Sequence, residues 1–224
     1  MNAAIFRPSW ILVSLLLSLC AVSAQAQDWP ARPVKLVVPY AAGQGTDVAG
    51  RYVAELIARE LGANIVVENR AGAGGNIGTQ LVARAPADGY TLLMGTNGTH
   101  AAAELLYANP GFDAAADFEP VALTGVLPLA IVTRPDSKVG SVQELVAAAR
   151  AQPDKINVAV TTTTSRSVFE LFRKEAKAPL FPVPYKGSAQ GITDLIGGQI
   201  DYMVDTVASV RAQVEAGKLK PLAI

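Results

Sequence analysis

The 224-residue chain carries 19 basic and 19 acidic side chains, and half of its residues are hydrophobic. This balance of charge gives no electrostatic basis for binding nucleic acid or an anionic membrane surface. The chain has one cysteine, Cys20, and one histidine, His100. A disulfide within the chain is therefore excluded, as is a zinc site built from several imidazoles.

The first residues have the pattern of a cleavable signal peptide, which we assign to residues 1–26. Arg7 precedes an apolar run at residues 11–22, and Ala24-Gln25-Ala26 is a small-x-small cleavage site. The apolar run is short for a membrane span. We therefore expect export, with an uncleaved anchor or a lipid on Cys20 as the alternatives; the bulky Leu19 argues against the lipid.

The next segment predicts a βαβ unit. Residues 34–39 form a β-rich apolar run, a glycine turn follows, and residues 47–61 have helical apolar spacing before Gly62. Residues 65–67 predict a second buried strand. A strand, helix and strand in this order imply a parallel pair of strands.

Strands and helices continue to alternate along the chain. We expect helices at residues 77–84, 101–106, 141–151, 165–176, 189–196 and 208–216, and strands at residues 91–94, 121–123, 129–133, 157–160, 181–183, 200–204 and 219–224. Short loops between such elements predict an α/β fold with helices on both sheet faces. We divide the chain into a first α/β domain (27–130), a second α/β domain (131–218) and a return hinge strand to the first domain (219–224).

Polar turns rich in Gly, Ser and Thr follow the strands in both halves. In open parallel sheets, ligands bind beyond the carboxyl ends of the strands. If the two sets of turns face each other, amides and hydroxyls would line a cleft suited to an anion, without a fixed positive side chain. The candidate ligand-binding residues are Tyr40, Ala42, Gly43, Gln44, Gly45, Thr46, Gly78, Asn97, Gly98, Thr99, Thr161, Thr162, Ser165 and Asp205.

Each candidate turn has a purely structural alternative. Residues 43–46 could be an ordinary βα turn, with Thr46 or Asp47 capping the helix. Residues 161–165 could extend the strand, with only Ser165 capping the next helix. A nucleotide site at residues 72–78 is disfavoured, because Ile77 stands where G-x-G-x-x-G requires glycine. Arg166 and Lys186 are minor candidates, for which solvation is the alternative.

Several motifs together resemble the Bug or TctC-type receptors of tripartite tricarboxylate transporters. They are VKLVVPYAAGQGTD, VVENRAGAGGNIGT, ADGYTLLMGTNGTH, VPYKGS and DLIGGQIDYMVD, in order from Trp29 onward. The resemblance implies a two-domain periplasmic-binding-protein type II fold that closes on a small carboxylate. It also implies a periplasmic location, delivery to membrane permease subunits, and no catalytic residues, metal or cofactor. The turn at residues 40–46 and loops of the second domain would contact the ligand, partly through water.

The chain departs from this family at three points. Gln44 stands where the family usually has glycine, and residues 161–166 replace a loop that usually contains glycines and a histidine. The family chain also usually continues by one more domain-scale piece. We therefore expect a C-terminally truncated chain with an incomplete first domain. The alternative functions are an exported hydrolase that uses His100, and a receptor fragment that no longer binds or that acts in sensing.

Overall fold

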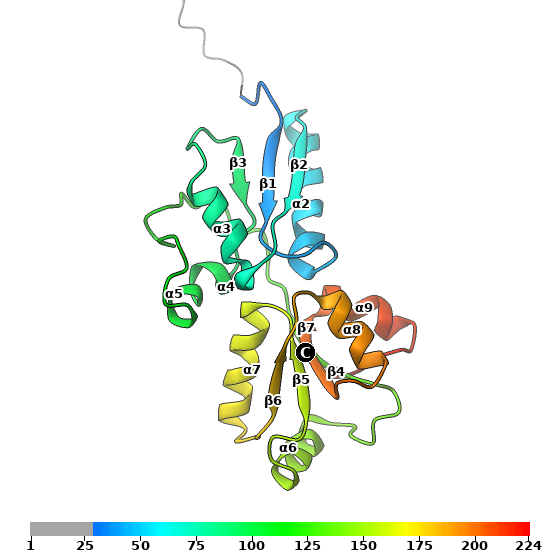
Figure 1. Cartoon of the computed structure of the whole chain (residues 1–224). Coiled ribbons are helices and arrows are strands. Elements are labelled where there is room, and N and C mark those ends of the chain that lie inside the picture. Colours follow the sequence, from blue (N-terminus) through cyan, green and yellow to red (C-terminus); the bar gives the residue numbers. More distant parts are fainter. Residues whose placement is uncertain (1–28) are drawn as a thin grey trace, which may run out of the picture. The chain divides into compact units, whose positions relative to one another are not determined.

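Two β-sheets organise the chain between Pro33 and Ile224, as the computed structural model shows (Figure 1). The structure describes residues 29–224, so the predicted signal peptide lies outside the described residues. We call the part built on the three-stranded sheet the first lobe and the part built on the five-stranded sheet the second lobe. No helix within residues 29–224 has the length and hydrophobicity needed to cross a bilayer.

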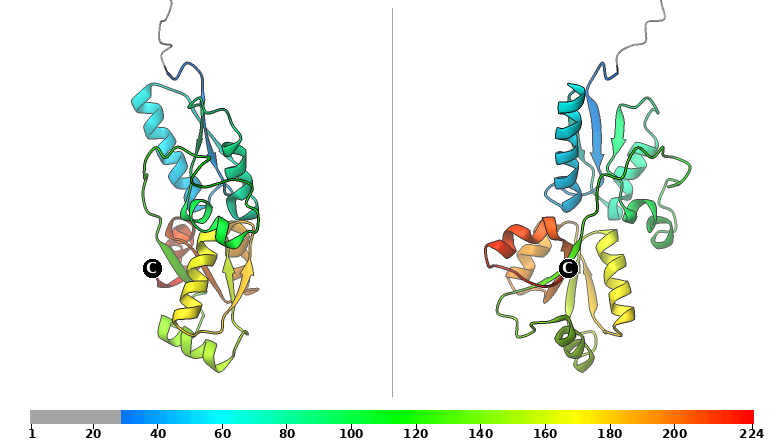
Figure 2. Two further views of the ribbon diagram at one scale, coloured as in Figure 1. Left: turned by 90° about the vertical axis from the view of Figure 1, so that its left-hand side faces the viewer. Right: turned by 180° about the vertical axis from the view of Figure 1, so that it is seen from behind.

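The first lobe is built on a parallel sheet in the order β2-β1-β3. β1 (Val34–Val38) pairs in parallel with β2 (Ile65–Asn69) and with β3 (Thr91–Leu93). The expected parallel pair is thus confirmed. The helices of this lobe are α2 (Gly45–Leu61), the 3-10 helix η1 (Ala73–Gly75), α3 (Asn76–Ala83), α4 (Asn97–His100) and α5 (Ala103–Leu106). In both views of Figure 2, α2 and α3 lie on opposite sides of the strands.

The second lobe is built on a mixed sheet in the order β6-β5-β7-β4-β8. Its strands are β4 (Leu129–Thr133), β5 (Asn157–Val160), β6 (Phe181–Pro184), β7 (Tyr202–Thr206) and β8 (Lys220–Ala223), and its helices are α6 (Val142–Ala151), α7 (Thr163–Glu175), α8 (Ser188–Ile196) and α9 (Val207–Glu215). β5 runs parallel to β6 and β7, whereas β4 is antiparallel to β7 and β8. The predicted α/β fold is confirmed in both lobes.

Alternation of side chains along the strands gives the second sheet two hydrophobic faces. Val158 and Val204 pack with Phe169 of α7 and Leu145 of α6 on one face. On the other face, neighbouring strand residues such as Met203 pack with α8 and α9. A sheet covered on both sides in this way holds the loops at its strand ends in fixed positions.

Two sequence predictions about elements differ from the structure. Residues 121–123 form no strand, and Leu123 is 88% exposed. The helix expected at residues 101–106 is shorter, because α5 begins only at Ala103, and a separate helix, α4, ends just before Ala101. An apolar run predicts a strand only if a partner strand lies beside it, and hydrophobicity alone does not reveal the partner.

The C-terminal strand lies at an edge of the second sheet. β8 pairs with β4, with a register irregularity between Ile131 and Val132. β4 begins at Leu129, so the domain boundary expected at residue 131 falls inside this strand. The segment 219–224, expected to be a return hinge strand, therefore contributes an edge strand to the second sheet.

Phe169→Ala should destabilise the second lobe by about 3–5 kcal/mol, because Phe169 is 1% exposed and its loss leaves a cavity between α7 and the sheet. Urea unfolding monitored by circular dichroism measures this change. Val168→Ala on the same helix is the control, since Val168 is 40% exposed and its truncation should cost well under half as much. Equal losses for the two variants would contradict the assigned core.

Candidate functional site

A cavity of about 430 Å³ lies where the strand ends of the two lobes meet. This volume is within the range of roughly 300–1,000 Å³ that is usual for small-molecule sites. The lining residues follow β1, β2, β5 and β6, with two more from the end of α5. They are Tyr40, Gln44, residues 71–75, Leu106, Tyr107, residues 160–163, Arg166, Pro184, Tyr185 and Lys186.

Direct hydrogen bonds hold the two lobes together around this cavity. They are Gln44 Nε2 to Ser188 Oγ (3.3 Å), Gly45 N to Ser209 Oγ (3.0 Å), Thr163 Oγ1 to Gly74 O (2.9 Å) and Thr164 Oγ1 to Asn97 Oδ1 (2.8 Å). Every one involves a Ser or Thr hydroxyl of the second lobe. The hydroxyl-rich turns predicted from the sequence therefore face the first lobe. This agrees with the expectation that the turns at the strand ends of the two lobes face each other.

Close backbone approach at the lobe boundary depends on glycine. A Cβ on Gly45 would lie 2.3 Å from Thr206 Oγ1, and one on Gly98 would lie 2.8 Å from Thr164 Oγ1. Neither glycine lines the cavity. These two glycines, which the sequence suggested for ligand binding, allow the lobes to approach each other.

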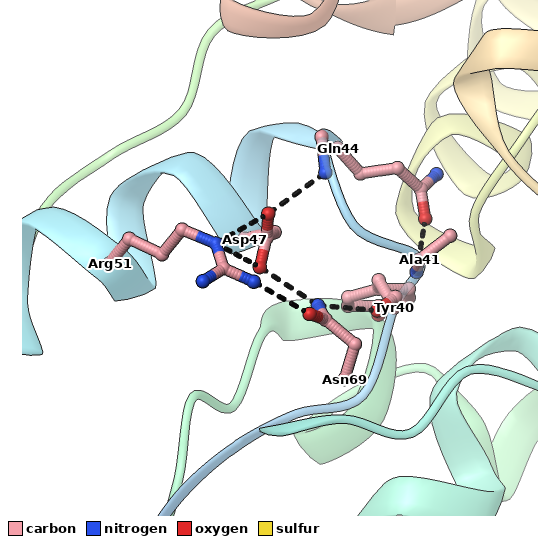
Figure 3. Close-up of polar contacts among 7 residues, drawn as sticks. Tyr40, Ala41, Gln44, Asp47, Arg51 and Asn69 are labelled. Atoms are coloured by element: carbon pink, nitrogen blue, oxygen red, sulfur yellow. Dashed lines mark hydrogen bonds and ion pairs between the residues drawn. The ribbon is translucent and has the colours of Figure 1, made fainter. Parts of the chain in front are cut away.

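A buried cluster around Asp47 braces the loop that follows β1 (Figure 3). Asp47 is 3% exposed and accepts hydrogen bonds from Gly43 N (2.8 Å), Asn69 Nδ2 (2.8 Å) and Arg51 Nε (3.1 Å). Asn69 Nδ2 also donates to the Tyr40 carbonyl at 3.0 Å. Burial favours a higher pKa for Asp47, but the bonds from Arg51, Gly43 and Asn69 outweigh it and lower the pKa. The carboxylate therefore remains charged and fixes the loop.

The cap expected for α2 was wrong. Gln44 is the N-cap, it makes no side-chain capping bond, and the helix begins at Gly45 rather than at Asp47. Asp47 instead reaches back from the first turn to the amide of Gly43, which has a positive φ of 80°. A carboxylate in the first turn satisfies an otherwise free amide in the same way as a side-chain cap.

The first turn of α7 presents backbone amides beside the cavity. Thr162, not Ser165, is the N-cap: its Oγ1 accepts from Ser165 N at 3.0 Å, in a reciprocal capping box. The expectation that only Ser165 caps was wrong, because the helix starts two residues earlier. The amides of Thr163 and Thr164 have no acceptor within the helix, as is general for the first turn. They carry the positive end of the helix dipole.

Asp205 lies behind the cavity wall and organises its hydroxyls. It is 1% exposed, and its Oδ2 accepts from Thr161 Oγ1 (2.8 Å) and Ser188 Oγ (2.6 Å). Its Oδ1 accepts from Thr206 N at 2.6 Å. Burial raises the pKa of Asp205, while the bonds from Ser188, Thr161 and Thr206 oppose the rise. The hydroxyl proton of Thr161 thus points away from the cavity toward this carboxyl group.

The charged side chains that line the cavity are both cations. Arg166 and Lys186 belong to the lining, and no Asp or Glu of residues 29–224 does. Tyr185 also lines it, but its hydroxyl donates to Asp194 at 2.7 Å, and burial together with that bond raises the pKa of Tyr185 to about 12. Contrary to the expectation of an uncharged lining, the cavity has fixed positive charge, because the start of α7 and the turn after β6 both reach it.

The structure brings four of the fourteen predicted site residues together in the lining: Tyr40, Gln44, Thr161 and Thr162. Ser165 and Asp205 support Thr161 from behind through hydrogen bonds, and Gly43 bonds to Asp47 in the loop that carries Tyr40 and Gln44. The other seven lie outside the lining, and they are Ala42, Gly45, Thr46, Gly78, Asn97, Gly98 and Thr99. Gly78, for example, packs against Pro39 and the carbonyl of Arg70.

Sequence reasoning left three parts of the lining out of the predicted site. Residues 72–75 line the cavity after β2, where the glycine turn was recognised as a strand end but only Gly78 was chosen from it as a contact. Their position at a strand end was the available signal. Leu106 and Tyr107 come from the end of α5, and no local pattern in the sequence marks them. Tyr185 follows β6, and its strand-end position was a usable signal.

His100 contacts Thr99 and Phe118. Its Nδ1 lies 2.9 Å from Thr99 Oγ1, and its ring packs edge-on against Phe118 at 4.8 Å. Burial lowers the pKa of His100. In the described part of the chain, no carboxylate bonds to His100 and the residue does not line the cavity. The general base of a Ser-His-Asp triad is an imidazole that a carboxylate orients, and the described surroundings of His100 do not match that arrangement.

Two α/β lobes that enclose a cavity at their strand ends define the class of bilobal solute-binding proteins. Comparison with known proteins agrees. The structure matches Rpa4515 of R. palustris, solved with adipate, with a TM-score of 0.84 and 37% identity over 88% of this chain and 66% of that one. It also matches MatC of Rhodopseudomonas palustris, solved with malate, with a TM-score of 0.79 and 33% identity over 86% of this chain and 66% of that one.

The chain belongs to the tripartite tricarboxylate transporter family receptor (TctC) family, whose family model matches residues 49–224. It is 36% identical to the protein BugT of Bordetella pertussis over 207 residues, which cover 91% of this chain and 64% of BugT. The chain therefore spans just under two thirds of the length of this relative. The resemblance and the fold predicted from the sequence motifs are confirmed, and the family consists of solute-binding receptors.

Asp47→Asn should lower the free energy of unfolding by about 2 kcal/mol at pH 7, because it weakens several charge-assisted hydrogen bonds. The folded-state pKa of Asp47 is depressed, so its contribution is present above the unfolded-state pKa and is lost as pH falls through the folded value. The difference in the free energy of unfolding between wild type and Asp47→Asn should therefore disappear as pH falls below about 4. Urea unfolding at several pH values measures it.

The control for this experiment is Asp136→Asn, since the Asp136 side chain is 75% exposed in its ion pair with Arg134. Its effect should stay below about 1 kcal/mol at every pH. A difference between wild type and Asp47→Asn that does not depend on pH would contradict the assigned ionisation.

Proposed function

We propose that the protein is a periplasmic receptor that captures a small carboxylate-bearing solute between its lobes and delivers it to the permease subunits of a tripartite transporter. The observation that carries the choice of ligand is the charge of the cavity. Arg166 and Lys186 line it, and no acidic side chain among the described residues does. Neither cation forms an ion pair within residues 29–224, so a bound anion would supply the counter-charge.

The start of α7 supports the same choice. The free amides of Thr163 and Thr164 lie at the positive end of a helix of 13 residues. A carboxylate there would accept hydrogen bonds from these amides, and Arg166, one turn further on, would pair with it. We propose Tyr40, Gln44, Thr161 and Thr162 as the further contact residues in the lining.

The relatives support the acid class of the ligand. Rpa4515 was solved with adipate and MatC with malate, and both match over more than four fifths of this chain. Location and partner rest on the family and on the signal pattern of residues 1–26, which favours export. The Ser, Thr and amide groups at the lobe boundary would allow the lobes to separate in water and to close again around a solute.

Dicarboxylates should raise the melting temperature of the protein. Succinate, malate and adipate, each added at about 100 times its dissociation constant, would stabilise the folded state by about 2.7 kcal/mol. For a chain of this size, that corresponds to a shift of roughly 5–10 °C in a thermal-shift assay. Succinamide, which has the size of succinate but no charge, is the matched control. If no mono-, di- or tricarboxylate shifts the melting temperature of the folded protein, the receptor proposal is wrong.

Arg166→Gln should weaken binding of the best acid in that panel by about 10- to 100-fold, because it removes a charge-assisted hydrogen bond in a partly enclosed site. Isothermal titration calorimetry measures the affinity, and the loss should shrink as salt is raised. Arg211→Gln is the control, since the Arg211 side chain is 73% exposed on α9 and pairs with Glu215. Equal affinities of wild type and Arg166→Gln would remove Arg166 from the site.

A further inference from the structure

Gln44 connects the cavity to both lobes. It lines the cavity, it is 3% exposed, and its side chain makes two hydrogen bonds. Its Oε1 accepts from Ala41 N at 2.9 Å within the first lobe, as Figure 3 shows, and its Nε2 donates to Ser188 Oγ at 3.3 Å in the second lobe. Among the described residues, no other first-lobe side chain in the lining donates a hydrogen bond to the second lobe.

The orientation of the Gln44 side-chain amide is fixed by its hydrogen-bonding neighbours, Ala41 on one side and Ser188 with Asp205 on the other. The Ala41 amide can only donate, so it requires the oxygen of Gln44. At the other end, the Asp205 carboxylate accepts the proton of Ser188 Oγ at 2.6 Å, which leaves a lone pair on Ser188 for an N–H of Gln44. Donors and acceptors therefore match in one orientation only, with the nitrogen of Gln44 toward the second lobe.

This orientation leaves one donor without a partner. The amide nitrogen of Gln44 has two hydrogens, and Ser188 takes one of them. The second has no acceptor within residues 29–224. A nearly buried N–H without an acceptor is unfavourable, and an oxygen of an anion in the cavity would satisfy it.

Resting on the receptor function proposed above, we propose that Gln44 is a specificity-determining residue that donates its free amide hydrogen to an oxygen of the bound acid. Ser188 and Asp205 are positioning residues: they hold the amide of Gln44 in the donating orientation, and they do so only when the lobes are closed. Recognition of the acid and closure of the lobes are thereby linked through one side chain.

If Gln44 served only to shape the loop, residue 44 would need only a hydrogen-bond acceptor and no donor. The bond from Ala41 needs only an acceptor, which a carboxylate supplies as well as an amide. Gln44→Glu keeps that acceptor and the size of the side chain. However, it cannot donate to Ser188 or to an acid, and it brings a second carboxylate toward Asp205. Gln44→Met keeps the volume and removes both polar contacts.

The test is calorimetric titration of wild type and variants with malate and adipate as probes. Gln44→Met should weaken the binding of at least one acid by about tenfold, and Gln44→Glu by about a hundredfold or more, since it adds repulsion to the lost bond. Ser188→Ala should weaken binding by several-fold, although Ser188 does not line the cavity. Gln143→Met, an exposed amide on α6, is the matched control and should bind as wild type does.

A double-mutant cycle separates positioning from a structural effect. Because Ser188 acts through Gln44, adding Ser188→Ala to Gln44→Met should cause little further loss. If the loss of affinity in the double variant equals the product of the losses in the two single variants, Ser188 does not act through Gln44 and the positioning role is wrong. Circular dichroism checks the fold of each variant. If Gln44→Met does not fold, Gln44→Asn replaces it, since it keeps the polar group but is one methylene too short to bridge Ala41 and Ser188.

The outcomes distinguish this proposal from the receptor function on which it rests. If wild type binds malate or adipate and Gln44→Met binds both with unchanged affinity, the role of Gln44 is wrong and the receptor function stands. If wild type binds neither probe nor any other carboxylate, the receptor function fails and the role of Gln44 fails with it.

Discussion

Parallel strands end at the same edge of a sheet, and in this protein that edge faces the other lobe in both halves of the chain. The loops after β1 and β2 therefore meet the loops after β5 and β6 around one cavity. The helices that follow these strands place their first-turn amides at the same edge. The charge of the cavity, the contacts between the lobes and the fixed orientation of Gln44 all follow from this geometry.

Buried carboxylates support the cavity from outside its lining. Asp47 holds the loop after β1 through Gly43 and Asn69, and Asp205 holds the hydroxyls of Thr161 and Ser188. Each carboxylate is nearly inaccessible and satisfied by several donors, as a buried charge must be. Negative charge is thus kept behind the wall, while cations line the cavity itself. This separation lets an anion bind next to a protein with no net charge.

Hydroxyl groups have a different role from the one expected of them. Thr163 and Thr164 donate their protons to Gly74 and Asn97 of the first lobe, and Thr161 donates to Asp205. The hydroxyl-rich segment therefore joins the lobes and anchors the wall, and it leaves donation toward an anion to backbone amides, cations and Gln44. Similarly, Gly45 and Gly98 bring the lobes close together instead of contacting a ligand.

The sequence by itself determined the class of fold, most of the helices and strands, and the general position of the site. Alternating apolar runs and glycine turns are local signals, and the rule that ligands bind at strand ends turns them into a location, which included Tyr40, Gln44 and Thr161. Only the tertiary structure decided which members of each turn face the cavity, that Tyr107 joins them, and that residues 121–123 remain unpaired. These outcomes depend on which loop lies opposite which, and on where each hydroxyl proton is donated. Both are set by contacts between residues far apart in the sequence, such as Gln44 with Ser188 and Thr163 with Gly74, which local sequence patterns do not encode.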